Sequence, residues 1–313
     1  MAVLFRIGAR DSKLSLAQTG LVRARLAAQL GANAAALEIV PITTSGDTIQ
    51  DRRLIEAGGK GLFTKELDEA LLDGRIDLAV HSLKDLPTRL PQGVALACVP
   101  EREDPRDAFL SLSAKSLSDL PAGVNVGTAS LRRQAQTLFA RPDLGVVTLR
   151  GNVDTRLRKL EAGAADATFL ALAGLKRLGL QDRATSIVDP HDMPPAACQG
   201  AMGLTARAGD ARVCNVLAEC EDPIARIEAE AERAFLEALD GSCRTAIGAL
   251  ARVSGQHMTF LGEALTPDGT TRWRREESIL LGANPIADAR DLALRLGRAI
   301  REEAGEALVL DAP

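Results

Sequence analysis

The sequence has no apolar run that approaches the ~20 residues needed to cross a bilayer, so we expect no membrane-spanning segment and no membrane partner. Its first ten residues, M-A-V-L-F-R-I-G-A-R, place an arginine inside the only apolar stretch there, and we expect no signal peptide. Five cysteines without regular spacing in 313 residues form no disulfide framework and are typical of a reducing compartment. We therefore expect a cytoplasmic protein.

Side chains that bind metals or nucleic acids are also few. The three histidines, at 81, 191 and 257, are scattered, and Cys214 and Cys220 do not have zinc-finger spacing. The net charge of −4 supplies no positive field for nucleic acid. We expect neither a metal site nor a nucleic-acid partner.

The residues that are present alternate between strand-like and helical patterns. Strands are predicted at 3–9, 37–43, 76–81, 124–127, 145–149 and 167–171, and helices at 14–30, 64–73, from about 131 and from about 153. This alternation predicts α/β layers with mainly parallel sheets. The irregular segments 100–107 and 189–196 are predicted to cross between two such domains.

The pattern changes after Pro223. A helix at 223–239, strands at 245–251, 257–264 and 272–280, and a helix at 284–304 predict a small α+β domain with a three-stranded antiparallel sheet. The last two of these strands are joined by the hairpin sequence T-P-D-G-T. We expect domain 1 at 1–100 plus 200–222, domain 2 at 101–199 and domain 3 at 223–313.

Arginine dominates the positive charge. Only seven of the 38 basic residues are lysines, which leaves 31 arginines. A GC-rich genome explains such a bias, and so does repeated bidentate recognition of carboxylates or phosphates. The positions of the arginines in the sequence favour recognition of carboxylates or phosphates. Hydroxyl and cationic residues follow four predicted strands, namely Arg10, Ser12, Thr128, Ser130, Arg132, Arg133, Arg150, Arg156, Arg158, Lys176 and Arg177.

Open α/β sheets bind ligands at the carboxyl ends of their strands. An arginine at the start of a helix interacts unfavourably with the positive end of the helix dipole. Several arginines at helix starts therefore indicate a bound anion that offsets this unfavourable interaction. We expect a polyanion rich in carboxylates. Ser12 and Ser130 can equally serve as helix N-caps.

Three further features leave alternatives open. Lys84 and Asp85 follow strand 76–81, either in a solvated turn before Pro87 or as a carboxylate that faces a developing cation. Cys243 is either a small buried hydrophobe or a thiol with chemistry. The glycine-rich segment 57–63 lacks P-loop spacing and is predicted to be a mobile flap that contains Lys60.

Several of these segments resemble the porphobilinogen deaminase (hydroxymethylbilane synthase) family in the same order along essentially the whole chain. The matching segments are V-H-S-L-K-D-L-P (80–87), E-R-E-D-P-R-D-A-F (101–109), V-G-T-A-S-L-R-R-Q (126–134), L-R-G-N-V-D-T-R-L (149–157), A-G-L-K-R-L-G-L (173–180), Q-G-A-M-G (199–203) and the Cys243 loop. The resemblance implies two periplasmic-binding-protein-like α/β domains plus a small α+β third domain.

The resemblance also implies an activity. A transferase of this family deaminates four porphobilinogen units and joins them head to tail into hydroxymethylbilane, in tetrapyrrole and haem biosynthesis. The chain grows on a dipyrromethane cofactor that is thioether-linked to the cysteine matching Cys243. The carboxylate matching Asp85 acts on the pyrrole nitrogens and on the cation formed when ammonia leaves. The product passes to uroporphyrinogen-III synthase, and the protein is expected to be a monomer.

The family's binding positions map onto this sequence residue by residue. The cofactor-binding positions are Lys84, Asp85, Thr128, Ser130, Arg132, Arg133, Arg150 and Gly151. The substrate-binding positions are Arg10, Ser12, Arg150, Arg156, Arg177 and Gln199, and the flap carries Lys60.

This sequence departs from the family pattern in places. It has G-S-C at 241–243 where G-G-C is usual, R-T-A-I-G where Q-V-P-I-G is usual, Ala129 in place of a serine, and Cys198 in place of a valine or glycine. None of these changes removes a charged group assigned above.

Two alternatives from other classes remain. A carboxylate-binding solute receptor or effector-sensing domain shares the two-lobed fold, because fold alone does not fix function. The absence of a signal peptide and of DNA-binding helices disfavours both, and neither explains a thiol in a third domain. A lysine Schiff-base enzyme that uses Lys84 or Lys60 is the second alternative, although a lysine beside an aspartate is more often an ion pair.

Overall fold

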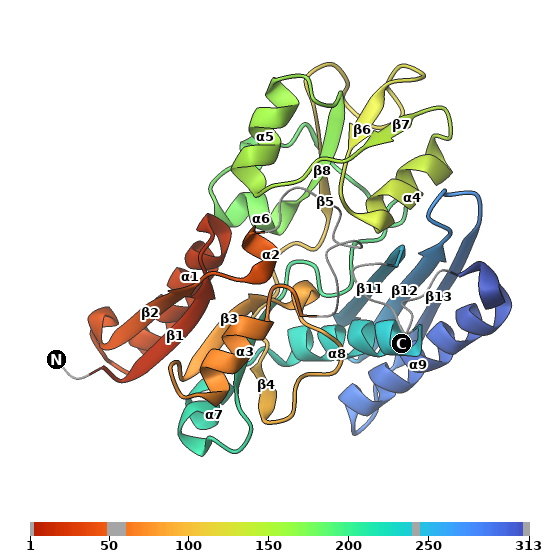
Figure 1. Cartoon of the computed structure of the whole chain (residues 1–313). Helices are drawn as coiled ribbons and strands as arrows, with labels where there is room; N and C mark the ends of the chain where they lie inside the picture. The colour runs from red at the N-terminus through yellow and green to blue at the C-terminus, as the bar shows by residue number, and fades with distance from the viewer. Residues whose placement is uncertain (1–2, 49–60, 240–244, 309–313) are drawn as a thin grey trace. The chain divides into compact units, whose positions relative to one another are not determined.

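The computed structural model describes residues 3–48, 61–239 and 245–308, which form three β-sheets with helices packed on them (Figure 1). These residues fall into two compact units. One contains the described residues of Met1–Asp51 and Gly58–Glu103 together with Ala201–Arg226. The other contains Asp104–Gly200 and the described residues of Ile227–Pro313.

The first unit is built on a five-stranded sheet with the order β2-β1-β3-β10-β4. Its strands are β1 (Phe5–Arg10), β2 (Leu37–Ile42), β3 (Leu78–Ser82), β4 (Val94–Cys98) and β10 (Met202–Arg207). Its helices are α1 (Lys13–Gln29), α2 (Ser45–Thr48), α3 (Lys65–Leu72) and α7 (Ala211–Ala218), with the 3₁₀ turns η1 (Ala34–Ala36) and η2 (Leu83–Asp85). Strand β1 pairs in parallel with β2 and β3, whereas β10 runs antiparallel to β3 and β4.

The second unit contains an α/β sheet of the same pattern, with the order β7-β6-β8-β5-β9. Its strands are β5 (Asp107–Ser111), β6 (Asn125–Gly127), β7 (Gly145–Val147), β8 (Ala167–Ala171) and β9 (Ser186–Ile187). Its helices are α4 (Leu131–Ala140), α5 (Val153–Glu161) and α6 (Leu172–Arg177), with η3 (Gln181–Arg183). Strand β6 pairs in parallel with β7 and β8, and β5 runs antiparallel to β8 and β9.

The predicted parallel character of the two sheets is therefore correct, with one antiparallel strand in each. Strands β4, β5, β9 and β10 were not predicted, and β5 and β10 were missed because each adjoins or overlaps a segment predicted to be a crossover. The segment 100–107 was assigned wholly to a connection, yet its last residue, Asp107, begins β5.

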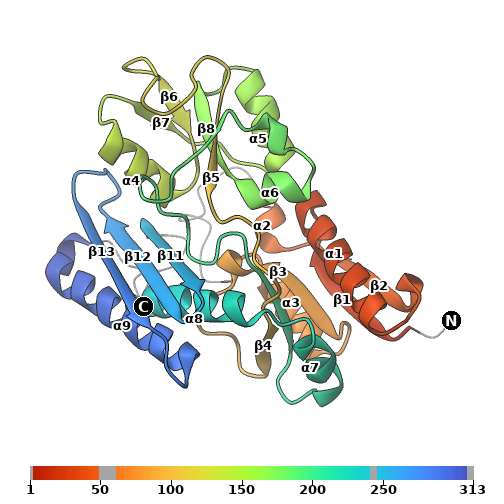
Figure 2. The ribbon, with the colours of Figure 1, turned by 180° about the vertical axis from the view of Figure 1, so that it is seen from behind.

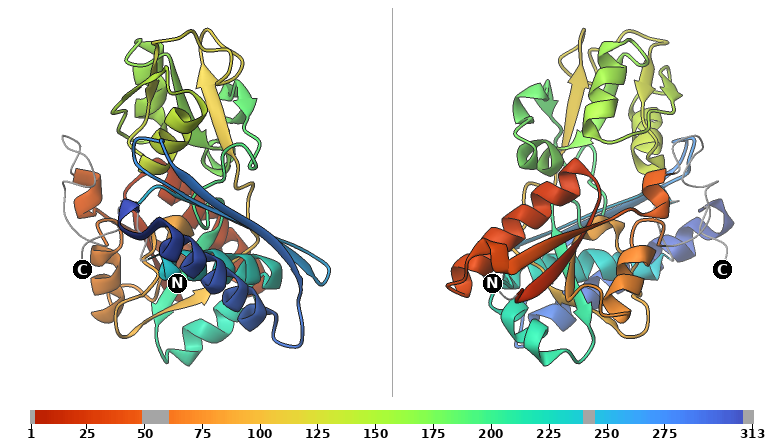
Figure 3. Two further views of the ribbon diagram at one scale, coloured as in Figure 1. Left: turned by 90° about the vertical axis from the view of Figure 1, so that its right-hand side faces the viewer. Right: turned by 60° about the vertical axis from the view of Figure 1, so that its left-hand side comes forward.

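The second unit also holds the predicted antiparallel sheet of β11 (Ile247–Ser254), β12 (His257–Leu265) and β13 (Arg272–Leu280). It packs against α8 (Pro223–Ala238) and α9 (Pro285–Ala304), which η4 (Gly305–Ala307) follows. The rings of Phe235 in α8 and Phe260 in β12 lie 5.3 Å apart, centroid to centroid. Helix α9 runs along one face of this sheet (Figure 2; Figure 3).

The predicted fold class is confirmed, namely two α/β sheets and a small α+β region with a three-stranded antiparallel sheet. The division of the second unit into separate domains at residue 223 stays a prediction. None of the helices in the described part of the chain is long and apolar enough to cross a membrane.

Local sequence signals account for several element ends. The Ser12 side chain caps α1 by accepting a hydrogen bond from the Ser15 amide at 3.3 Å, and Ser130 caps α4 by accepting from the Arg133 amide at 3.4 Å. Gly74, with φ of 71°, follows α3 in the left-handed conformation that ends many helices. The capping roles predicted for the two serines are confirmed.

One buried acid in α3 makes the stability of the fold depend on pH. Asp68 is 5% exposed and its Oδ1 has no hydrogen-bond partner, so burial raises its pKa to about 6. The folded state therefore disfavours the ionised form, and stability is lost as the pH rises from about 4 to about 6.

Replacing Asp68 by asparagine is expected to raise the free energy of unfolding by about 2 kcal/mol at pH 8 and to leave it nearly unchanged at pH 3. Urea denaturation at the two pH values measures the difference. Asp73→Asn is the matched control, because the Asp73 side chain is 66% exposed at the end of the same helix. An equal effect of Asp68→Asn at both pH values would contradict the burial argument.

Candidate active site

In the first unit, Arg10 and Asp85 meet at the carboxyl ends of two neighbouring strands. Arg10 is the last residue of β1, and Asp85 ends the η2 turn that follows β3. Because β1 and β3 are parallel neighbours, their ends lie at the same edge of the sheet. The Arg10 Nη1 atom is 3.7 Å from Asp85 Oδ2, and the two side chains are 22% and 31% exposed. The structure thus brings together a cation and a carboxylate that the sequence placed on this edge.

Further contacts hold this edge in place. The Arg10 guanidinium lies 4.2 Å above the centre of the Phe63 ring, a cation–π contact. The Gln18 Nε2 of α1 donates to Ser82 Oγ at 3.0 Å, which ties the N-terminal half of α1 to the end of β3. Lys84 precedes Asp85 in η2.

His81, on the same strand as this edge, is a neutral group. It is buried, and its Nε2 lies 3.0 Å from Thr205 Oγ1. Burial, followed by the charge of Arg10, lowers the pKa of His81 to about 4. The imidazole therefore stays uncharged at neutral pH.

In the second unit, three arginines gather where β6 and β7 end and α4 and α5 begin. We call Arg133, Arg150 and Arg156 the arginine cluster. The pKa of Arg156 falls to about 10 because its guanidinium is buried and because Arg133 and Arg150 repel its charge. Its Nε donates to the Gly151 carbonyl at 2.9 Å.

Two of the three arginines in the cluster lack a carboxylate partner in the part of the chain that the structure describes. Among the described residues, no carboxylate forms a salt bridge with Arg150 or Arg156, and Arg150 Nη1 is buried without a hydrogen-bond partner. Thr128 and Ser130 lie at the start of α4, and Asn152 caps α5 through the Thr155 amide at 2.9 Å. Two helix N-termini and three guanidinium groups form an arrangement suited to anions.

A buried carboxylate that sequence reasoning missed, Asp107, binds the arginines of α4. Its oxygens accept hydrogen bonds from Arg132 Nη2 at 2.8 Å, Arg133 Nη2 at 2.7 Å and Gln199 Nε2 at 2.8 Å. Burial alone would raise the pKa of Asp107, but the charges of Arg132 and Arg133 outweigh burial and hold the pKa well below its usual range.

Arg132, Arg133 and Gln199 therefore already have partners inside the protein. Arg133 Nη1 also donates to the Phe169 carbonyl at 2.8 Å, and Gln199 Nε2 to the Pro105 carbonyl at 2.8 Å. The Nε atoms of Arg132 and Arg133 are buried and have no hydrogen-bond partner. Their contacts with a ligand stay a prediction.

The other predicted positions have separate surroundings. Arg177, the last residue of α6, donates from Nη2 to the Gly200 carbonyl at 2.6 Å. Gly151 has φ of 121°, and a Cβ there would come within 2.5 Å of Thr155, so the turn between Arg150 and α5 requires glycine. Cys243 and Lys60 lie outside the described residues.

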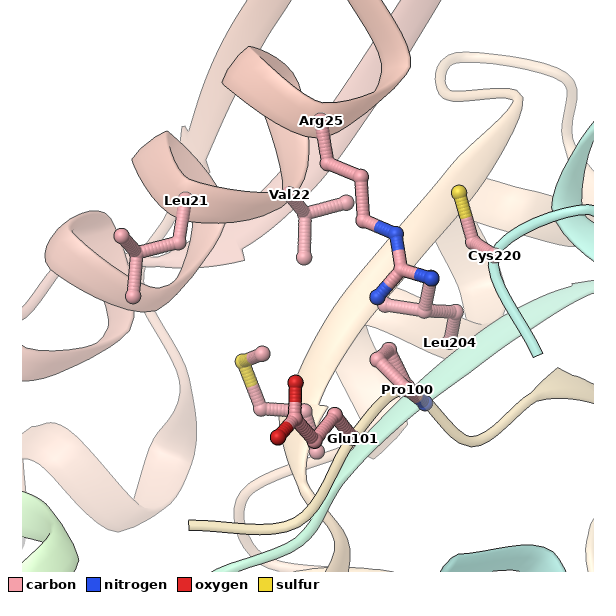
Figure 4. A pocket seen from close by; sticks show the side chains of 8 residues that line it. Leu21, Val22, Arg25, Pro100, Glu101, Leu204 and Cys220 are labelled. Atoms are coloured by element: carbon pink, nitrogen blue, oxygen red, sulfur yellow. The ribbon is translucent and has the colours of Figure 1, made fainter. Parts of the chain in front are cut away.

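A pocket in the first unit is distinct from these positions (Figure 4). Leu21, Val22 and Arg25 of α1 line one side, and Pro100, Glu101 and Cys220 are among the residues that line the rest. None of the predicted site residues belongs to it.

Family models cover nearly the whole chain. Residues 5–215 match the model described as "Porphobilinogen deaminase, dipyromethane cofactor binding domain", and residues 226–302 match "Porphobilinogen deaminase, C-terminal domain". The chain belongs to the porphobilinogen deaminase family. The predicted family, the transferase activity in tetrapyrrole biosynthesis and the dipyrromethane cofactor are confirmed, and the receptor alternative is not favoured.

Individual relatives agree with this assignment. The chain is 58% identical over 312 residues to the porphobilinogen deaminase of Caulobacter sp. (strain K31), covering 97% of this chain and 98% of the relative. It is 55% identical over 315 residues to that of Phenylobacterium zucineum (strain HLK1), covering 97% and 98%.

Two solved structures that resemble the chain share less of its sequence. A nutrient-binding protein from Burkholderia cenocepacia bound to methionine has a TM-score of 0.44 at 15% identity, covering 71% of this chain and 94% of that one. A periplasmic substrate-binding protein of an ABC transporter from Coxiella burnetii has a TM-score of 0.43 at 16% identity, covering 71% and 94%.

Proposed function

We propose that this chain joins four porphobilinogen units into hydroxymethylbilane on a dipyrromethane primer bound to Cys243. Asp85 serves as the catalytic carboxylate in this proposal, and the arginine cluster binds the carboxylates of the primer and the growing chain. Arg10 at the neighbouring strand end binds a substrate carboxylate. The chain acts as a cytoplasmic monomer, and its product passes to uroporphyrinogen-III synthase, as the family resemblance implies.

The observation that carries this proposal is that, among the described residues, no carboxylate pairs with Arg150 or Arg156 of the arginine cluster. Burial, followed by repulsion from the charges of Arg133 and Arg150, lowers the pKa of Arg156 to about 10. Each porphobilinogen unit carries an acetate and a propionate, so every unit added brings two carboxylates. Carboxylates bind guanidinium groups through charge-assisted hydrogen bonds, which would relieve the repulsion.

The residues present suit the dipyrromethane cofactor. Arg150 Nη1 and the Nε atoms of Arg132 and Arg133 are buried donors without partners, and a carboxylate-bearing group could satisfy them. Thr128 and Ser130 add hydroxyl groups at the start of α4. When bound, the cofactor supplies the terminal pyrrole to which the first substrate unit is joined.

Asp85 would act electrostatically on the substrate. Ammonia leaves porphobilinogen to give a resonance-stabilised cation, and a carboxylate fixed beside it lowers that barrier. A pair of unit charges ~4 Å apart gains about 4 kcal/mol at an effective dielectric constant near 20, which corresponds to roughly a thousandfold in rate. The Asp85 oxygens can also accept hydrogen bonds from the pyrrole nitrogen, and Arg10 at 3.7 Å helps to fix their orientation.

Replacing Arg150 by leucine tests the anion-binding role. A lost charge-assisted hydrogen bond of about 1.5–3 kcal/mol predicts a rise of roughly 10- to 100-fold in the KM for porphobilinogen, or a matching fall in cofactor loading. Because the substitution also relieves repulsion, the unloaded protein should lose no stability to urea. Intact mass, steady-state kinetics and urea denaturation provide the readouts.

Arg158→Leu is the control, because Arg158 is exposed and lies on α5, the helix that follows Arg150. Kinetics and loading indistinguishable between Arg150→Leu and Arg158→Leu would defeat the proposed role of the cluster.

A further inference from the structure

A chain of buried hydrogen bonds connects Arg132 with the antiparallel sheet of the second unit. Arg132 Nη1 donates to Gln136 Oε1 at 2.8 Å, one turn along α4. Gln136 Nε2 in turn donates to Glu263 Oε1 of β12 at 2.7 Å. Arg132, Gln136 and Glu263 are 4%, 5% and 1% exposed, so water does not compete for these bonds.

The carboxylate of Glu263 determines which way the Gln136 amide points. Gln136 Nε2 donates to the Pro194 carbonyl at 2.8 Å as well as to Glu263, and both of those groups only accept. A reversed amide would set its oxygen against two acceptors and its NH₂ group against the Arg132 guanidinium. Glu263 thereby keeps an acceptor turned toward Arg132.

Arg132 is fixed on both sides as a result. Its Nη2 donates to Asp107 at 2.8 Å, and its Nη1 donates to Gln136 and to the Pro194 carbonyl at 2.9 Å. Its Nε remains the buried donor without a partner. The direction in which this Nε points depends on the anchors at the other two nitrogens.

The same region packs tightly against the start of β11. Ala135 of α4 forms an apolar cluster with Ala246 and Leu265, and the Leu265 amide donates to the Ala246 carbonyl at 3.0 Å. A Cβ at Gly248 would lie 2.8 Å from the Pro194 carbonyl. Ala246 follows Cys243 by three residues in the sequence, so the helix that carries Arg132 lies against the strand that follows the proposed attachment point.

We infer that Glu263 is a positioning residue that acts through Gln136 to hold Arg132 in the orientation that receives a ligand carboxylate. This inference rests on the proposed ligand-binding role of Arg132. It assigns a part in the reaction to a residue of the antiparallel sheet whose other contact, with Arg274 at 2.5 Å, is an ordinary ion pair.

Glu263→Gln removes the charge that orients Gln136 and keeps the shape of the side chain. We expect the KM for porphobilinogen to rise about tenfold, or the fraction of chains that carry the cofactor to fall in proportion, with kcat within about twofold of the parent, as expected for the loss of one charge-assisted contact. Gln136→Met breaks the same link and leaves the Glu263–Arg274 pair intact, so it should give the same result even if Glu263→Gln folds poorly.

Arg132→Leu separates this inference from the proposed function. If Arg132→Leu leaves loading and KM unchanged, the ligand-binding role of Arg132 is wrong. If it impairs them while Glu263→Gln and Gln136→Met do not, only the positioning role of Glu263 is overturned. Intact mass, steady-state kinetics and urea denaturation of all variants give the readouts.

Discussion

Replacing Asp85 by asparagine is expected to lower the turnover of porphobilinogen by two orders of magnitude or more and to leave a folded protein that carries its cofactor. The amide keeps the size of the side chain and can accept a hydrogen bond, but it has no charge with which to stabilise a cation. The expected loss follows from the roughly thousandfold effect of one unit charge at ~4 Å. Steady-state kinetics on protein whose loading has been checked by intact mass measures it.

The surroundings of Asp85 indicate that its replacement affects the rate of the reaction but hardly the stability of the fold. Its side chain is 31% exposed and its pair with Arg10 spans 3.7 Å, and such partly exposed pairs contribute about 0–1 kcal/mol. The free energy of unfolding should therefore change little in Asp85→Asn. Asp11→Asn is the control, since Asp11 follows Arg10 on the same edge and is exposed. A near-normal rate for Asp85→Asn would rule out the catalytic role.

The edge that carries Arg10 and Asp85 could be predicted from the sequence because parallel strands place their carboxyl ends together. That rule requires only that the strands be recognised and that their helices connect them in the usual sense. The helix caps at Ser12 and Ser130 could be predicted equally well, because a cap depends on a few adjacent residues.

The position of Asp107 could not be predicted in the same way. Its burial exists only because β5 is inserted between β8 and β9, and the sequence segment that contains it is charged and interrupted by proline. Arg132 and Arg133 likewise look the same in sequence whether an internal carboxylate or a ligand receives them. Partners that lie 25 and 26 residues away along the chain leave no local pattern.

The structure thus divides the arginines at the end of β6 and β7 by their partners. Arg132 and Arg133 share one buried carboxylate, whereas Arg150 and Arg156 have none among the described residues. Removing a partner from a buried ion pair typically costs about 3–5 kcal/mol, so Asp107 stabilises Arg132 and Arg133 even without a ligand. Arg150 and Arg156 retain the positive charge that a carboxylate-rich ligand would neutralise.

Cys243→Ser is expected to abolish covalent attachment of the dipyrromethane cofactor. The thiolate is the nucleophile of cysteine chemistry, and a serine hydroxyl is almost entirely protonated at neutral pH and far less nucleophilic. The wild-type chain should carry the added mass of two pyrrole units, and the variant should have the mass calculated from its sequence. Product formation should fall with the loss of the primer.

The remaining cysteines supply the controls for this experiment. Cys98, Cys198 and Cys220 are buried, and burial raises the pKa of both Cys98 and Cys220, which makes their thiolates scarce. Cys214 is partly exposed, so Cys214→Ser is the matched variant and should keep the full adduct. An adduct that persists in Cys243→Ser, or one that is lost in Cys214→Ser, would place the attachment elsewhere. An active wild-type chain without any adduct would defeat the proposed primer itself.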